Sequence, residues 1–227
     1  MGKRWYRPLW VTFVLSFGLG GSAARADVVY SQDPHLLSVL FVSDSNSVLG
    51  LQQADDFSLA AGSQIQAVTF YGKWTSLTQP AESFTVRFFT DNGAGAPNVN
   101  PIFEATNLTP VFRDSVGFLP PLLNVFQYGI NLPTPINLNG GQTYYLSIVN
   151  NAPNPLGDWG WLGTDLGATV RFERQGDGVA FSAFLDANLT FALLDSPVPE
   201  PSPAVLGGAA LLAFGLWRRL GGFLMGA

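Results

Sequence analysis

Hydrophobic and polar residues alternate along several stretches in the middle of the chain. Between residues 83 and 90, Phe84, Val86 and Phe88 share one side of the repeat, with polar residues between them. The same two-residue period recurs at 143–150 and 188–194, whereas a helical period is nearly absent between residues 27 and 196. Because strand side chains point alternately to two faces, this pattern predicts half-buried β-strands.

Turn-forming segments separate these stretches. Clusters rich in Gly, Asn and Asp stand at 60–64, 90–98, 138–142 and 174–178, the last between expected strands at 170–173 and 179–184. Such residues permit the positive φ of tight hairpin turns. About ten strands at this spacing predict an all-β fold, an antiparallel β-sandwich or jelly roll, over residues 27–196. Eighteen phenylalanines and six tryptophans can fill the space between two sheets.

The first 26 residues have the pattern of a secretory signal peptide. Three basic residues precede an apolar run at 9–19, and Ala24 and Ala26 provide the small residues of a signal peptidase site. We expect cleavage after Ala26, which leaves Asp27 as the first residue. An uncleaved anchor helix is the alternative, but the apolar run is short for a membrane span.

The C-terminal end joins a proline-rich linker to an apolar run. Four prolines lie within residues 197–203, so neither a strand nor a helix continues through this segment. Residues 204–217 carry no charge, and Arg218 and Arg219 follow directly. A helix over this run is about 20 Å long, against a bilayer core of about 30 Å. We expect residues 204–227 to form a transmembrane helix whose arginine end is cytoplasmic. A generic tail anchor and an amphipathic core helix are the alternatives.

The order of these C-terminal parts resembles the PEP-CTERM sorting signal of exported proteins in Gram-negative bacteria. After the linker prolines come the apolar run and the arginine pair, and the matching residues are Val198, Pro199, Glu200, Pro201, Ser202, Arg218 and Arg219. The resemblance implies that a membrane-embedded exosortase recognises and processes the tail. The protein would be exported through the inner membrane, anchored, and then found at the cell surface or in the extracellular matrix. The middle of the chain also looks like the jelly-roll-like ectodomains that accompany such tails.

Charge and composition narrow the partners of the middle region. Between residues 27 and 196 there are five basic and fifteen acidic residues, a net charge of −10. A domain this acidic repels nucleic-acid phosphates and is compatible with cations or neutral sugars. The chain has no cysteine, so no disulfide can hold the exported domain together.

Few residues suggest catalysis. The one histidine, His35, lies near the expected mature N-terminus, and with no cysteine it makes both a catalytic triad and a zinc site improbable. Asp55 and Asp56 are adjacent, for which we favour a turn or cap role, because in a strand they would point to opposite faces. A folded pair of acids such as Glu82 and Asp158 could serve a polysaccharide hydrolase, although no spacing indicates one.

Oxygen-rich loops raise the hypothesis of a structural calcium ion. Asp91 and Asn92 stand in the segment 90–98, and calcium is bound by oxygen ligands from such loops. A plain hairpin loop explains the same residues, because Asp, Asn and Gly favour turns. We expect the hairpin and keep calcium as a hypothesis, with no other cofactor.

Trp159 and Trp161 suggest a carbohydrate site. They are two residues apart, so in a strand both rings face the same way. If exposed, they could stack on sugar rings of an exopolysaccharide while Asp158 bonds the hydroxyl groups. The alternative, which we favour, is that both rings belong to the core.

These observations predict a non-enzymatic protein of the cell surface or extracellular matrix, acting by adhesion or assembly. Its expected partners are signal peptidase, an exosortase, the membrane and an exopolysaccharide, but no nucleic acid. The first alternative is a carbohydrate-binding module using the two tryptophans. The second is a polysaccharide hydrolase that uses carboxylates alone.

Overall fold

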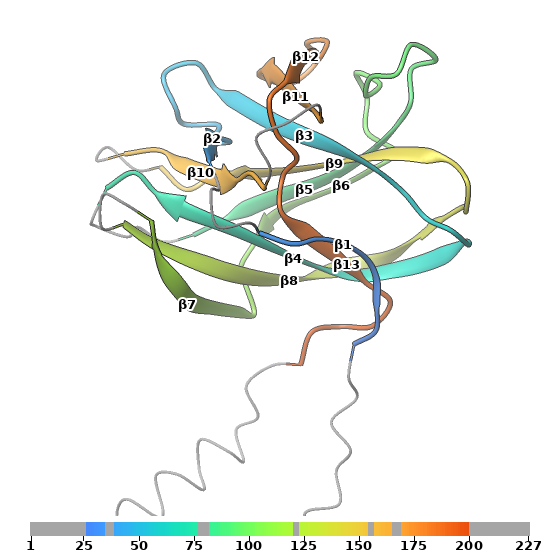
Figure 1. The fold of residues 1–227 in the computed structure, drawn as a ribbon, viewed down its shortest axis with the longest axis horizontal. Helices are drawn as coiled ribbons and strands as arrows, with labels where there is room; N and C mark the ends of the chain where they lie inside the picture. The colour runs from blue at the N-terminus through green and yellow to red at the C-terminus, as the bar shows by residue number, and fades with distance from the viewer. Residues whose placement is uncertain are drawn as a thin grey trace, which may run out of the picture.

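Two antiparallel β-sheets face each other across a shared core (Figure 1). The computed structural model describes residues 26–34, 39–76, 82–119, 123–153, 157–164 and 169–199, with the backbone alone at 117–119 and 123–124. The described part of the chain contains no helix that is long and apolar enough to cross a membrane. Every ladder between strands is antiparallel, so the prediction of an all-β antiparallel fold is confirmed.

Strand β4 organises the larger sheet, which has seven strands in the part of the chain that the structure describes. One edge of β4 pairs with β8, which carries β7. The other edge is shared, because β13 pairs with residues 67–70 and carries β1, whereas β10 pairs with residues 72–74 and carries β2. The strands of this sheet are β1 (Val28–Gln32), β2 (Leu40–Val42), β4 (Ser63–Trp74), β7 (Phe112–Leu119), β8 (Leu123–Leu138), β10 (Trp159–Leu162) and β13 (Phe191–Leu194).

Within the described residues, the second sheet has six strands in the order β12-β11-β3-β9-β5-β6. Its strands are β3 (Leu51–Ser58), β5 (Phe84–Thr90), β6 (Phe103–Leu108), β9 (Thr143–Asn150), β11 (Val170–Gln175) and β12 (Ser182–Leu185). All four residues of β12 are exposed, since this strand forms an edge of the sheet. The strand expected at 179–184 therefore begins later, after the turn that contains Gly176 and Gly178, both with positive φ.

The space between the sheets is filled with aromatic and branched side chains. The alternating residues of the predicted strands all point into it: Phe84, Val86, Phe88, Tyr144, Leu146, Ile148, Leu189, Phe191 and Leu193. Ring centroids of Phe70 lie 5.2 Å from Phe84 and 5.1 Å from Tyr128, so neighbouring rings pack directly. The inward faces read from the two-residue period are therefore confirmed.

The outward face of the six-stranded sheet is also largely buried, which the prediction of half-buried strands did not anticipate. Arg87 on β5 and Arg174 on β11 are 6% and 3% exposed. The segment between β5 and β6 and the turn after β11 fold over this face, where Phe181 packs on Phe89 and Ala96 packs on the cluster that contains it. Two connections thus act as a cover for a second, smaller cluster.

Candidate functional site

The first and last described strands bring the two ends of the domain together. β1 pairs antiparallel with β13, so Val28 lies opposite Leu194. One residue further out, the Asp27 N–H donates to Asp195 Oδ1 and the Asp195 N–H donates to the Asp27 carbonyl, each at 3.2 Å. Figure 1 shows both ends leaving the same side of the sandwich. The geometry places the chain's entry and exit next to each other.

Beyond β13, a side-chain clamp holds the chain on the outer face of the seven-stranded sheet. Asn131 on β8 accepts a hydrogen bond from the Val198 N–H at 2.7 Å and donates one to the Val198 carbonyl at 3.2 Å. The amide group thus imitates a strand partner for one residue. Val198 itself is buried against Ala67 and Leu194, and Ala26 packs on the same cluster. The clamp therefore holds the chain inside the proline-rich segment, one residue before Pro199.

Only part of the predicted sorting residues lies within the described structure. Val198 is in the clamp, Pro199 follows it, and Ala26 is half-buried beside it. The remaining residues of the two terminal signals lie outside the described residues, and these are Ala24, Glu200, Pro201, Ser202, Arg218 and Arg219. His35 also lies outside the described residues, so none of these residues can be placed in a site.

Trp159 and Trp161 are core residues, and the exposure that sugar stacking requires is contradicted. Both side chains are fully buried between the sheets. The Trp159 ring lies 5.1 Å from Phe84, and the Trp161 Nε1–H donates to the Thr190 carbonyl at 2.9 Å. The two rings do face the same way, but that way is inward. Neither ring can stack on a ligand at the surface.

Glu82 and Asp158, the acids considered for hydrolysis, are both bonded to neighbouring parts of the fold. Glu82 accepts hydrogen bonds from Trp74 and Tyr128 and forms an ion pair with Arg113 at 3.3 Å. Asp158 is fastened through its backbone to Thr75, with its N–H 2.9 Å from the threonine hydroxyl. The structure therefore gives Glu82 the role of joining strands and loops, not that of a poised acid.

Asp55 and Asp56 lie in the middle of β3, so the prediction that they occupy a turn or a cap is wrong. As adjacent strand residues they point to opposite faces. Asp55 is fully buried and accepts hydrogen bonds from the backbone N–H groups of Leu189 and Asp56. Burial raises the pKa of Asp55 well above its usual range, and these two hydrogen bonds oppose the shift. The carboxyl thus links the six-stranded sheet to the segment before β13.

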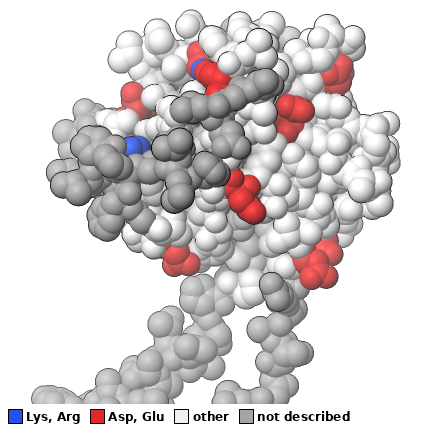
Figure 2. All heavy atoms as spheres, viewed as in Figure 1, with Lys and Arg blue, Asp and Glu red and all other residues white. Residues whose placement is uncertain are grey.

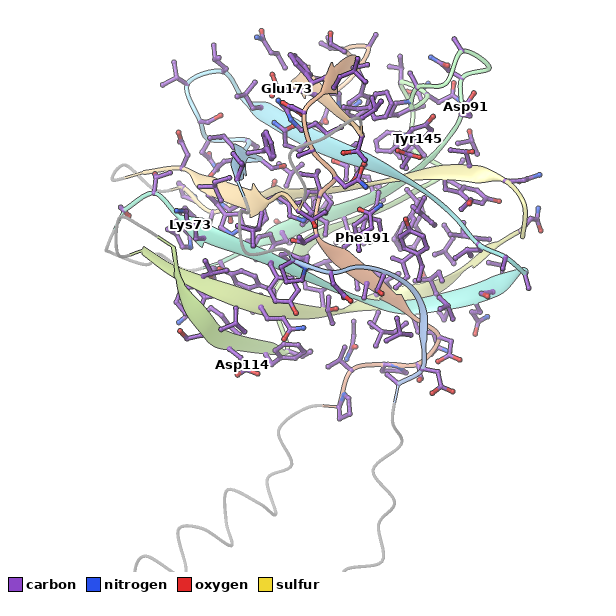
Figure 3. All side chains as sticks on the ribbon, in the orientation of Figure 1. Lys73, Asp91, Asp114, Tyr145, Glu173 and Phe191 are labelled. Carbon is purple, nitrogen blue, oxygen red and sulfur yellow. The ribbon has the colours of Figure 1, made fainter. Side chains whose placement is uncertain are left out.

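Asp91 and Asn92 stabilise the hairpin between β5 and β6. Asp91 Oδ1 accepts from the Gly93 N–H, Asp91 Oδ2 accepts from the Tyr145 hydroxyl at 2.7 Å, and Asn92 Oδ1 accepts from the Ala94 N–H. Figure 3 shows the Asp91 and Tyr145 side chains close together. The hydrogen bond from Tyr145 holds the pKa of Asp91 below its usual value. Among the residues described, no group of three or more His, Asp or Glu side chains is arranged to hold a metal ion. The carboxylate faces donors, which suits a turn better than a cation.

The basic residues of the domain are mostly hidden, which leaves its surface acidic. Four of the five basic residues between 27 and 196 are buried, and these are Lys73, Arg87, Arg171 and Arg174. Figure 2 shows acidic side chains spread over one face with little basic surface among them. Polyanions are therefore repelled more strongly than the net charge alone implies.

Sequence reasoning missed Asn131, which carries the clamp. Its position inside β8 marks it as an ordinary strand residue, and no short motif signals a side chain that bonds a segment 67 residues away. No protein-family model matches this chain, and no curated protein matches it either.

Proposed function

We propose that the protein is an exported, non-enzymatic surface or matrix protein that its C-terminal tail sorts. Signal peptidase cleaves after Ala26, the sandwich folds outside the inner membrane, and an exosortase processes the tail near Pro199-Glu200-Pro201. Within this proposal the sandwich is a jelly-roll-like ectodomain and acts through its surface, by adhesion or assembly. The two antiparallel sheets support the ectodomain assignment.

The observation that carries the proposal is the pairing of the two ends. Residues 27 and 195 are hydrogen-bonded to each other, and Val198 is clamped one residue before the Pro-Glu-Pro segment. A domain whose ends leave side by side can remain folded while both neighbouring segments approach one membrane. The clamp also fixes the spacing between the folded domain and the Pro-Glu-Pro motif, since the motif begins at the residue after Val198. Both features suit a folded cargo carried by its tail.

The chemistry of the domain supports a role without catalysis. The carboxylates of Glu82, Asp91 and Asp55 are occupied by tyrosine, arginine or backbone partners, so they serve the fold. The acidic surface keeps exported copies apart and leaves neutral or cationic material as the natural contact.

The test is cell fractionation in the native host, with mass spectrometry of both termini. The wild-type chain should begin at Asp27 and reach the surface or matrix fraction without its C-terminal tail. Alanine at Pro199, Glu200 and Pro201 together should leave the N-terminus at Asp27 but keep the intact tail in the membrane fraction.

The matched control replaces prolines of the same linker outside the motif. Pro197→Ala with Pro203→Ala removes two prolines but keeps Pro-Glu-Pro, and this variant should be processed as the wild type is. Two results would overturn the proposal: a wild-type chain starting at Met1 or Gly2 in the cytoplasm, or normal processing of the triple variant.

A further inference from the structure

A polar cavity opens at the seam between the two sheets. Its volume is about 380 Å³, and it lies where β1 meets β3 and the start of β11. The polar side chains that line it are Tyr30, Gln32, Asp56, Ser58, Thr169 and Asn188. This volume is within the range of small-ligand sites, near its lower end.

Several of these groups have hydrogen-bonding capacity that the protein leaves unused. The Gln32 amide donates to the Tyr30 hydroxyl at 2.8 Å and to the Asp56 carbonyl at 3.2 Å, so the Tyr30 O–H remains free to donate. In the part of the chain that the structure describes, Gln32 Oε1 and the Thr169 hydroxyl are buried without any partner. Such groups are costly to leave unsatisfied, since each loses its bonds to water.

Asp56 adds an acceptor to the cavity. Its side chain is half-buried, and within the described residues no other residue donates a hydrogen bond to its carboxylate. Burial raises the pKa of Asp56 and also that of Tyr30, so both groups are poorly solvated in their charged forms. A ligand that donates hydrogen bonds to the carboxylate would replace the missing solvation.

The lining selects the chemistry of the ligand. None of its described side chains is basic, so anions lack a counter-charge, and the single carboxylate provides too few ligands for a divalent cation. Amide, hydroxyl and carboxylate groups beside the half-buried ring of Tyr30 match a molecule with many hydroxyls and an apolar ring face. A neutral saccharide unit has these properties, because each of its hydroxyls both donates and accepts.

We infer that this cavity binds one unit of a neutral saccharide, with Asp56 accepting from its hydroxyls and Tyr30 donating to one. The site is distinct from the buried tryptophans, and it does not depend on the sorting tail. It would give the displayed domain a specific contact with neutral glycans around the cell.

The experiment is saturation-transfer difference NMR on the full-length chain in a phosphocholine detergent, which carries no sugar headgroup. The probes are glucose, galactose, mannose and N-acetylglucosamine, each at millimolar concentration. At least one probe should give a difference signal. That signal should fall at least fivefold in Asp56→Asn and in Tyr30→Phe, which keeps the ring and removes only the hydroxyl.

A matched control and a second variant keep the outcome decisive. Asp114→Asn makes the same charge change at an exposed residue of β7. Figure 3 shows Asp114 well apart from Phe191, and Tyr30 of the cavity stacks on Phe191 with ring centroids 5.5 Å apart. This control should keep the full signal. If Asp56→Asn or Tyr30→Phe lowers the melting temperature so far that the domain is unfolded in the experiment, Asn188→Ala takes its place. The Asn188 side chain lines the cavity and makes no described hydrogen bond, so its removal should not disturb the fold. Absence of signal for all four sugars, or equal signal in wild type and the cavity variants, would overturn the inference. Sorting would be unaffected by either result.

Discussion

The space between the sheets and the outer face of the six-stranded sheet are both buried, but they are built from different chemistry. The inner layer is aromatic, with Phe70, Phe84 and Trp159 in mutual ring contact. The outer layer contains Arg87 and Arg174, whose guanidinium groups share the Gln52 side-chain oxygen at 3.2 and 2.8 Å. The six-stranded sheet is therefore buried on its inner face by aromatic packing and on its outer face by loops that buried arginines bind.

The outer layer holds connections in place by directed contacts. Asp177, in the turn after β11, forms ion pairs with both arginines at 3.1 Å, and Arg174 also donates to the Val99 carbonyl. The Arg174 guanidinium lies over the rings of Phe89 and Phe181, at 5.3 and 4.6 Å from their centroids. Apolar area stabilises the inner layer without regard to direction, whereas here geometry decides which loop is held.

Alternation in the sequence therefore shows which face of a strand a residue takes, but not whether that face is exposed. Arg87 falls at the polar position of its strand and is nevertheless buried, since two loops cover it. Three changes, from the largest effect to the smallest, test how the two layers differ.

Trp159→Ala should cause the largest loss, because it opens a cavity where four aromatic rings meet. We expect the free energy of unfolding to fall by about 3–5 kcal/mol, the usual cost of removing a buried tryptophan side chain. Urea unfolding followed by circular dichroism measures it. Val48→Ala, at a fully exposed position, is the control and should change stability by less than about 0.5 kcal/mol. A loss below about 1 kcal/mol for Trp159→Ala would show that the inner layer does not hold the fold together.

Arg174→Met should cost less, because methionine keeps much of the packing and removes only the directed bonds. The Val99 carbonyl loses its partner and the Gln52 oxygen keeps only Arg87, so we expect a loss of about 1–3 kcal/mol. Unfolding in urea gives the value, and limited proteolysis should show earlier cutting in the segments 91–102 and 176–181. If methionine left both stability and proteolysis unchanged, the outer layer would be packing alone.

Asp55→Asn should have the smallest effect on stability. It tests the protonation of a carboxyl group that points into the core. Burial raises its folded pKa above the unfolded value of 3.8, so the unfolded chain releases this proton at lower pH than the folded one. The wild type should therefore lose stability as the pH rises from about 4 toward the folded pKa, and the contribution is constant above it. Asp55→Asn cannot titrate, so its Tm relative to wild type should rise across the same interval. Thermal melts of both chains at pH 4, 5, 6 and 7 measure this, and a constant difference between them would contradict the shift.

The sequence pattern predicted the inner layer well and the candidate sites poorly. Periods of two and the turn residues at 90–98 and 138–142 are local properties, so they identify strands, inward faces and hairpins without knowledge of the partner strands. Trp159 and Trp161 show the limit. Their spacing says that they share a side, but whether that side is core or surface depends on which sheet lies opposite.

The amino-acid sequence is enough to predict the all-β class, the inward residues of the strands, and the acidic balance of the middle region. Tertiary structure alone decided that loops would bury Arg87 and Arg174, that Asn131 would clamp Val198, and that Tyr30 and Asp56 would border one cavity. The reason is sequence separation. Each of these arrangements joins residues from distant parts of the chain, and only the pairing of strands brings them within reach of one another.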